Sequence, residues 1–224
     1  MTVLILGAEK GGVGKTSLAL NLAVMATNAG IDTVLLDADR QQSATKWLNN
    51  RINFPELRPI SILANCADPL REISSLANRY QLVICDIGAQ NYKALIECAL
   101  LADMYLLPTG TSDMDLQPAE DLLQLLGKLR PIQADRPIDI RCVLSKAPGH
   151  PTSAENKNAK ERLQSQGHSV MNSIITQRSS WRSMANSGRA LQELKGKSKD
   201  EKAVAEMSAL YAEVVQILTQ HNGG

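Results

Sequence analysis

The chain has 224 residues, of which 44% are apolar and only 3% aromatic, so its length suits a single domain with an aliphatic core. Its formal net charge of +1 excludes binding of nucleic acid or membranes through overall charge, and any such contact needs a local patch. The cysteines lack the spacing of zinc or disulfide frameworks, and no apolar run reaches the length of a membrane span. No secretion signal precedes the first apolar run, so we expect a cytoplasmic protein.

The chain begins with the pattern of a strand, a glycine-rich turn and a helix. Residues 2–7 are mostly apolar and typical of a buried strand, and Leu18, Leu22 and Met25 recur at helical spacing beyond the turn. The turn runs Lys-Gly-Gly-Val-Gly-Lys-Thr-Ser over residues 10–17. Its glycines allow backbone conformations in which successive N–H groups face an anion, so the stretch predicts a phosphate-binding loop.

Each residue of this loop is a candidate contact for a nucleotide. Lys15 is expected to reach the β- and γ-phosphates, Thr16 to coordinate Mg²⁺, and the helix beginning there to present its positive end. Glu9 stands where the usual phosphate-loop pattern has its first glycine. A glycine-rich turn with an incidental Lys-Thr pair is the alternative, and the flanking strand and helix argue against it. The predicted contacts are Lys10, Gly11, Gly12, Val13, Gly14, Lys15, Thr16 and Ser17.

Carboxylates follow two further apolar runs that are typical of buried strands. One run ends at Asp37 and Asp39, and another ends at Asp86. The carboxyl ends of parallel strands share one edge of a sheet, where ligands of open α/β folds bind. Asp86 matches the Walker B pattern, which predicts a carboxylate that holds Mg²⁺ opposite Thr16. Asp37 and Asp39 could instead cap the next helix, and Asp86 could be a purely structural residue.

Strands and helices alternate along the rest of the chain. Residues 46–59 are polar and interrupted by prolines, and Pro131 and Pro137 bound a predicted loop. This alternation predicts one α/β domain over residues 1–224, with a doubly wound, mainly parallel sheet, helices on both faces and the P-loop NTPase fold. Further strands are predicted at 60–63, 104–107, 138–144 and 169–175, and helices at 68–78, 91–102, 116–129 and 154–166.

These motifs together resemble the ParA/MinD class of deviant Walker-A ATPases. The likeness rests on residues 10–16, on Asp37-Ala-Asp39 with Gln41 and residues 43–45, and on the strand ending at Asp86, in that order. The short length and the sequence Ile-Ile-Thr-Gln-Arg at residues 174–178 resemble the small ParA-type, ParF-like partition ATPases. The chain departs from these proteins at Arg40, where they usually have proline, and in the short Ile-Gly-Ala that follows Asp86.

The resemblance implies a slow ATPase that binds Mg²⁺ and ATP as a nucleotide-sandwich homodimer. In this class the lysine matched by Lys10 reaches across the dimer interface to the phosphates of the partner. The residue matched by Asp39 positions the attacking water near the metal, and the residue matched by Asp37 supports the metal shell of the nucleotide. The implied catalytic residues are Lys10, Lys15 and Asp39, and the implied metal site is Thr16, Asp39 and Asp86.

The segment 178–202 concentrates positive charge, with seven basic residues against three acidic ones. Serines and asparagines lie among them, which suits contacts with a phosphate backbone, and no base-reading motif is present. A solvated surface is the alternative, and the family resemblance favours non-specific DNA binding by the ATP-bound dimer. The predicted DNA contacts are Arg178, Arg182, Arg189, Lys195, Lys197 and Lys199.

Residues 201–220 carry apolar side chains at helical spacing and no basic residue beyond Lys202. A membrane-binding helix would carry lysines or arginines beside its apolar face, so this helix is expected to pack onto the sheet.

The sequence therefore predicts an ATPase that coats nucleoid DNA and is released when an adaptor protein, such as a centromere-binding protein, stimulates hydrolysis. Segregation of a plasmid or chromosome is the expected role, with positioning of a protein cargo over the nucleoid as the alternative. A membrane-surface ATPase of the MinD type and a P-loop enzyme with a small-molecule substrate are the remaining alternatives. The helix at residues 201–220 argues against the membrane-surface ATPase, and Lys10 argues against the small-molecule enzyme, which would not need this lysine and would bind no DNA.

Overall fold

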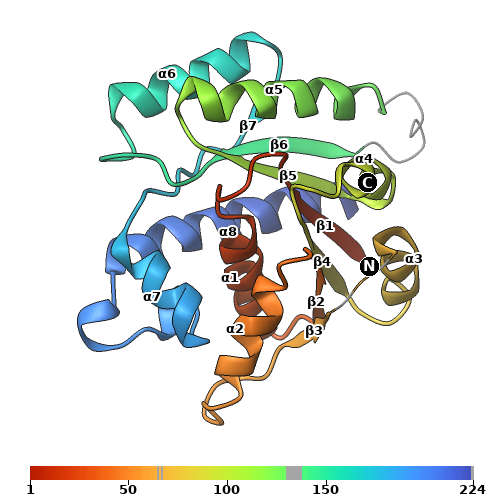
Figure 1. The fold of residues 1–224 in the computed structure, drawn as a ribbon, viewed down its shortest axis with the longest axis vertical. Coiled ribbons are helices and arrows are strands. Elements are labelled where there is room, and N and C mark those ends of the chain that lie inside the picture. Colours follow the sequence, from red (N-terminus) through yellow and green to blue (C-terminus); the bar gives the residue numbers. More distant parts are fainter. Residues whose placement is uncertain (65, 67, 130–137, 223–224) are drawn as a thin grey trace.

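The computed structural model describes residues 1–64, 66, 68–129 and 138–222. Seven strands form one sheet in the order β3-β2-β4-β1-β5-β6-β7, and all neighbouring pairs are parallel (Figure 1). The predicted doubly wound α/β class is confirmed. The strands are β1 (Thr2–Gly7), β2 (Thr33–Ala38), β3 (Ser61–Leu63), β4 (Leu82–Ile87), β5 (Met104–Thr109), β6 (Asp139–Leu144) and β7 (Ser169–Val170).

Helices connect successive strands and cover both faces of the sheet (Figure 1). The α-helices are α1 (Lys15–Asn28), α2 (Ser43–Arg51), α3 (Pro69–Leu76), α4 (Tyr92–Glu97), α5 (Asp113–Gly127), α6 (Ala154–Ser165), α7 (Ser179–Ser187) and α8 (Glu201–Asn222). Short 3₁₀ turns lie at η1 (Cys98–Leu101), η3 (Leu191–Glu193) and η4 (Gly196–Ser198).

The central strands β1, β2, β4 and β5 are mostly apolar because both of their faces are buried, whereas the edge strands β3 and β7 have exposed residues. Val3 and Ile5 on β1 belong to a core cluster that includes residues of α3, α4, α5 and α6. Leu4 and Leu6 point the other way, into a cluster that includes residues of α1, α2, α7 and α8. The alternation along one strand thus builds two hydrophobic layers, one on each side of the sheet.

β1 lies at the centre of the sheet, between β4 and β5, and the chain winds outward from it in both directions. The loop after β1 therefore opens at the point where the strand order reverses. In open α/β sheets this switch point at the carboxyl ends of the strands is where ligands bind. The topology places the glycine-rich loop, the end of β2 and the end of β4 side by side.

Two elements differ from the sequence prediction. α2 covers Ser43–Arg51, although residues 46–59 showed no helical signal beyond their polarity. The strand predicted at 169–175 forms ladder pairs only over Ser169–Val170. The backbone N–H groups of Asn172 and Ser173 donate instead to the Glu213 carboxylate of α8, which interrupts the pairing until Ile175 and Thr176 pair again with the segment after β6. The loop predicted between Pro131 and Pro137 lies outside the described residues.

α8 lies against the sheet with its apolar face covered. Ala203, Met207, Leu210 and Val214 recur along one side of the helix and are buried in the same cluster as α1. In the described ranges no helix is long and apolar enough to cross a membrane. The apolar stripe of α8 is therefore used inside the fold.

Candidate functional site: a nucleotide cavity

The loop after β1 lies at the carboxyl edge of the sheet, and its conformation depends on glycine. Gly12 and Gly14 have φ angles of 79° and 93°, in the left-handed region that other residues rarely adopt. Gly14 is the N-cap of α1, and the buried Val13 accepts a hydrogen bond from the Ser145 hydroxyl at its carbonyl oxygen. α1 begins at Lys15, so its first N–H groups lack partners within the helix and are suited to an anion.

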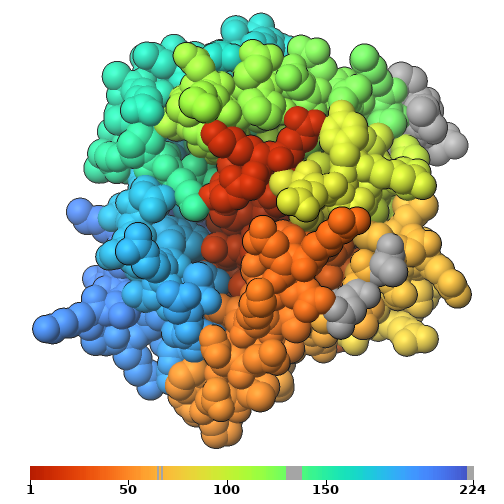
Figure 2. All heavy atoms as spheres, in the orientation of Figure 1, coloured from red at the N-terminus to blue at the C-terminus, as the bar shows by residue number. Residues whose placement is uncertain are grey.

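A cavity of 710 Å³ opens above this loop. Figure 2 shows the red residues of the loop lying between α2, in orange, and α7, in blue. Of the predicted ATP contacts, Gly11, Gly12, Gly14, Lys15, Thr16 and Ser17 line the cavity, whereas Lys10 and Val13 do not. The cavity has the size and the position that a nucleoside triphosphate needs.

Lys15 is buried and faces the carboxylates of the neighbouring strand ends. Its Nζ donates a hydrogen bond of 3.3 Å to the Lys10 carbonyl oxygen. Burial lowers the pKa of Lys15, and the charges of Asp86 and Asp39 act to raise it. A buried ammonium group whose nearest charges are these carboxylates is well placed to bind the phosphates of a nucleotide.

Asp86, at the end of β4, is fully buried, and neither of its carboxylate oxygens has a hydrogen-bond partner among the described residues. Burial and the nearby Asp37 raise the pKa of Asp86 to about 7, while Thr16 and Lys15 moderate the rise. The Thr16 hydroxyl lies close enough to have this effect without forming a hydrogen bond of ordinary geometry. A buried carboxylate with no partner is costly unless something binds it.

The donors around Asp86 fit a magnesium ion. Mg²⁺ prefers hard oxygen ligands and usually takes one or two from the protein, with nucleotide phosphates and water completing its shell. Thr16 and Asp86 provide a hydroxyl and a carboxylate beside the phosphate loop. No group of three or more His, Cys, Asp or Glu residues that could hold a metal occurs in the part of the chain described.

Asp37 and Asp39 occupy different environments although only one residue separates them. Asp37 is buried, is the register partner of Asp86 and accepts hydrogen bonds from the Thr45 N–H and hydroxyl, at 3.0 and 2.8 Å. It therefore holds the first turn of α2, as the capping alternative supposed, and it does not line the cavity. Asp39 lines the cavity. A side chain at Gly88 would place its Cβ only 2.9 Å from the Asp39 carboxyl carbon, so glycine allows this close approach.

Lys10 points away from the cavity of its own chain. Its Nζ lies 2.5 Å from an Asp115 carboxylate oxygen and 3.1 Å from the Met114 carbonyl oxygen, at the start of α5. The structure thus brings together Lys15, Thr16, Asp39 and Asp86 and leaves Lys10 outside the group.

The sequence pattern of the family described as the CobQ/CobB/MinD/ParA nucleotide binding domain matches residues 4–191. The chain belongs to this family. The match covers the phosphate loop, both carboxylate-bearing strand ends and α7, so the predicted ParA/MinD-class assignment is confirmed.

Two known relatives of this ParA/MinD-family chain carry different names. Protein ParA of Rhizobium radiobacter is 23% identical over 214 residues, which cover 95% of both chains. The maintenance of carboxysome distribution protein A of Gloeobacter kilaueensis is 35% identical over 111 residues, 48% of both chains. Among solved structures, an aspartate-to-alanine variant of McdA from Cyanothece in complex with ATP matches with a TM-score of 0.69 and 16% identity, covering 94% of this chain and 96% of that one. This structural match shows the shared fold.

The predicted DNA contacts of this family member fall into two groups. Arg178 pairs with Glu206 at 2.7 Å, and Arg189 pairs with Glu56 at 2.9 Å and lies 3.9 Å from the centre of the Phe54 ring. Both arginines are partly buried, and their charges are neutralised within the chain. The other four residues are exposed, although Lys199 pairs with Glu201 at 3.2 Å. Those four are Arg182, Lys195, Lys197 and Lys199.

The sequence did not predict that α2 and α7 form one wall of the cavity. α2 contributes Lys46, Trp47 and Asn50, and α7 contributes Ala185 and Asn186. The spacing of the buried Ala44, Trp47 and Arg51 is the helical signal that the polar neighbours concealed.

A further lining residue, Lys146, follows β6 and adopts a φ of 51°. A lysine in the left-handed region is unusual, and such strain is common at binding sites. No local pattern around Lys146 indicated this conformation.

Proposed function

We propose that this chain is a Mg²⁺-dependent ATPase that acts as a DNA-binding switch. ATP drives formation of a homodimer, the dimer binds DNA without sequence preference, and an adaptor protein that stimulates hydrolysis releases it. The observation that carries this proposal is the double use of α7, which lines the nucleotide cavity with Asn186 and carries the exposed Arg182 at the start of the basic segment. One short helix thus connects the two activities.

The residues of the cavity divide the chemistry of hydrolysis between them. Lys15 and the first turn of α1 would hold the phosphates, and Thr16 with Asp86 would hold Mg²⁺, which neutralises the charge that develops on the oxygens. Asp39 reaches the cavity from the end of β2 and is placed to orient a water molecule. Lys10 is turned away, so the cavity of one chain lacks the extra cation, and a second chain would supply it. Hydrolysis would therefore be slow and would depend on dimerisation.

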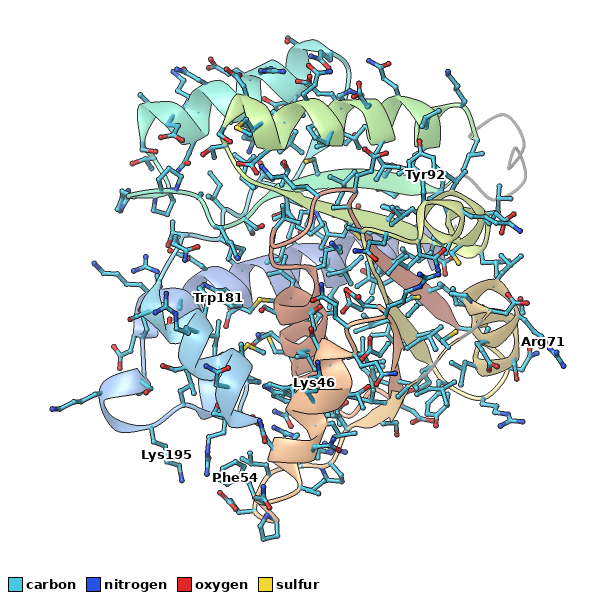
Figure 3. All side chains as sticks on the ribbon, viewed as in Figure 1. Lys46, Phe54, Arg71, Tyr92, Trp181 and Lys195 are labelled. Atoms are coloured by element: carbon cyan, nitrogen blue, oxygen red, sulfur yellow. The ribbon has the colours of Figure 1, made fainter. Side chains whose placement is uncertain are left out.

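The DNA-binding surface that we propose is narrower than the one predicted from the sequence. Arg182, Lys195 and Lys197 are exposed and form no ion pair with any residue that the structure describes. Figure 3 shows Lys195 on the outer side of the segment that follows α7. We leave out Arg178 and Arg189 because their charges stabilise contacts within the chain. Two copies of the surface in a dimer would bind a duplex more tightly than one by avidity.

Binding to a random-sequence duplex, titrated with salt, tests this surface. The protein should bind with a slowly hydrolysed ATP analogue and not with ADP. The double variant K195A/K197A should bind every duplex more weakly, whatever its base sequence. The slope of its log binding constant against log salt concentration should fall by about one unit for each phosphate that it no longer neutralises. No binding in any nucleotide state at low salt would contradict the proposal.

The matched control is the double variant K128A/K157A. It removes the same charge from α6 and from the residue after α5, on the other side of the molecule from the basic segment (Figure 1). Both control lysines are exposed. The control should bind as the unmodified protein does, because the effect depends on local rather than net charge. An equal weakening in both double variants would show that only net charge matters.

The relative named for carboxysome distribution favours a second candidate, positioning of a protein cargo on nucleoid DNA. This candidate shares the ATP-driven binding of DNA and differs in the adaptor. Nucleoid association of a fluorescent fusion, compared in cells with and without the genes next to this one, distinguishes the two. Clustering that follows a plasmid indicates partition, and clustering that follows a protein assembly indicates positioning. A membrane-surface ATPase is disfavoured because α8 buries its apolar face.

A further inference from the structure

The ammonium group of Lys10 is held at the start of α5 by two oxygens. Its Nζ forms an ion pair of 2.5 Å with Asp115 and donates a hydrogen bond of 3.1 Å to the Met114 carbonyl. The exposed fractions of the Lys10 and Asp115 side chains are 37% and 21%, so the pair lies at the surface and is open to competition. Glu9 and Gly11, on either side of Lys10, line the nucleotide cavity, whereas Lys10 does not.

The first turn of a helix is an unfavourable position for a cation, because the N–H dipoles of the helix point toward it. Two aspartates occupy this turn of α5, Asp113 and Asp115. Asp113 pairs with Arg162 at 2.6 Å, so its carboxylate already has a basic partner other than Lys10. The position of Lys10 therefore depends on the Asp115 carboxylate.

The Asp115 carboxylate is itself held in one orientation. The Ser112 hydroxyl donates to its second oxygen at 2.6 Å, and the Thr109 hydroxyl donates to the Asp115 carbonyl at 2.9 Å. A side chain at Gly110 would place its Cβ only 2.6 Å from the Asp115 carboxyl carbon, so the carboxylate fills a space that only glycine leaves open. β5, its following loop and α5 together build a fixed acceptor for Lys10.

We propose that Asp115 is a positioning residue that holds Lys10 away from its own nucleotide until a second copy of this chain docks. This inference rests on the proposed function, in which Lys10 acts across a dimer. Each protomer must break its own Lys10–Asp115 pair before Lys10 turns to the phosphates of the partner. Asp115 therefore raises the protein concentration at which ATP causes dimerisation.

The variant D115N tests this inference, with D113N as the matched control. Asp113 lies two residues away on the same helix turn, and its side chain is 93% exposed. Dimerisation is measured by sedimentation velocity with Mg²⁺ and a slowly hydrolysed ATP analogue. Exposed ion pairs contribute up to about fivefold to an equilibrium, so two broken pairs give up to about a 25-fold tighter dimer for D115N. D113N should dimerise as the unmodified protein does.

A double-mutant cycle shows whether Asp115 acts through Lys10. Urea unfolding of the nucleotide-free monomer is compared for K10A, D115N and K10A/D115N. The expected coupling is about two- to fivefold in the unfolding equilibrium constant, and no coupling would overturn the inference. The variant D115S, which keeps a hydrogen-bond acceptor in the first helix turn, replaces D115N if the asparagine variant folds poorly.

The two proposals fail in different ways. If the unmodified protein stays monomeric with every nucleotide, the proposed function is wrong, and the inference about Asp115 is wrong with it. If the unmodified protein dimerises but D115N dimerises no more tightly than D113N, only the role of Asp115 is wrong.

Discussion

At the scale of single residues, Asp86 lowers the stability of the ligand-free fold and is placed to interact with a ligand. The site leaves its carboxylate buried and without a partner next to Thr16 and Lys15. A residue selected only for stability would not be a carboxylate at this position, because an unpaired buried charge is costly. Binding of a cation would offset this cost, which supports the proposal that Asp86 holds Mg²⁺.

The variant D86N should hydrolyse ATP about 10- to 100-fold more slowly than the unmodified protein, because losing an oxygen that orients a metal typically has this effect. Its rate should respond only weakly to Mg²⁺ concentration. Asp103 provides the control, since it is a buried carboxylate at the amino end of β5 that accepts a hydrogen bond from Val3. D103N should hydrolyse ATP at the normal rate per folded molecule. A normal rate and Mg²⁺ dependence in D86N would contradict the assignment.

Motif spacing was sufficient to predict most of the loop residues that line the cavity but not which way the side chains point. Asp37 and Asp39 lie on the same strand end, yet one holds α2 and the other lines the cavity. Lys10 directly precedes the glycines, yet it pairs with Asp115, 105 positions further along the chain. Such orientations depend on contacts between distant segments, which a local pattern does not contain.

At the scale of elements, α2 packs against α7 and the segment that follows it, and this contact, called the joint below, links the nucleotide cavity to the basic surface. Arg51 of α2 is 3% exposed and forms a bidentate ion pair with Glu193, at 2.6 and 2.9 Å. The Trp47 indole donates to the Met184 carbonyl at 2.9 Å. Gly188 has a φ of 73°, and a Cβ there would overlap the Arg51 backbone nitrogen, so the two elements touch through backbone.

The variant E193Q should lower the free energy of unfolding by about 3 kcal/mol, because it leaves the buried Arg51 guanidinium without a counter-charge. E56Q is the matched control, since it removes the same kind of partner from Arg189 at a position where the glutamate is 51% exposed. Exposed pairs contribute little, so E56Q should unfold almost as the unmodified protein does. Urea unfolding followed by circular dichroism measures both. Equal effects of the two substitutions would show that burial of the pair does not matter.

This joint was beyond prediction from the sequence. α2 has a buried stripe of only three residues among polar ones, so its hydrophobic periodicity is weak. Gly188 resembles any glycine at the end of a helix, and only the packing of Arg51 against it shows why no side chain fits. The basic residues that pair with Glu56 and Glu206 could not be separated from those that face solvent, because both kinds lie in one charged run.

At the scale of the whole molecule, the centre of the sheet was predictable because strands such as β1, β4 and β5 are apolar runs that end at polar loops. Burial on both faces removes the alternation of polar and apolar residues and leaves a strong signal. β7 was the exception, since its pairing is interrupted where the Glu213 carboxylate accepts two backbone N–H groups and resumes only as a bridge at Thr176. The predicted order of motifs along the chain then placed the site, because parallel strands bring their carboxyl ends to one edge.

The stability that Asp86 contributes and the stability that Glu120 contributes depend on pH in opposite directions. The pKa of Asp86 is raised from 3.8 to about 7 by burial, so its contribution to stability is complete below pH 3.8 and is lost as pH rises through about 7. The pKa of Glu120 is lowered from 4.5 by Arg162, which links α5 to α6 at 2.5 Å. Its contribution is present above pH 4.5 and is lost as pH falls below that value.

The nucleotide-free and metal-free protein should therefore be more stable near pH 5.5 than at pH 8, by about 2 kcal/mol, since one pKa unit corresponds to about 1.4 kcal/mol. Chemical denaturation across this range measures the difference. D86N should be nearly independent of pH between 5.5 and 8, because it lacks the group that titrates there. Below pH 4.5 both proteins should lose stability, and E120Q should lose less. A stability that rises from pH 5.5 to 8 would show that the Asp86 carboxylate finds a partner in solution.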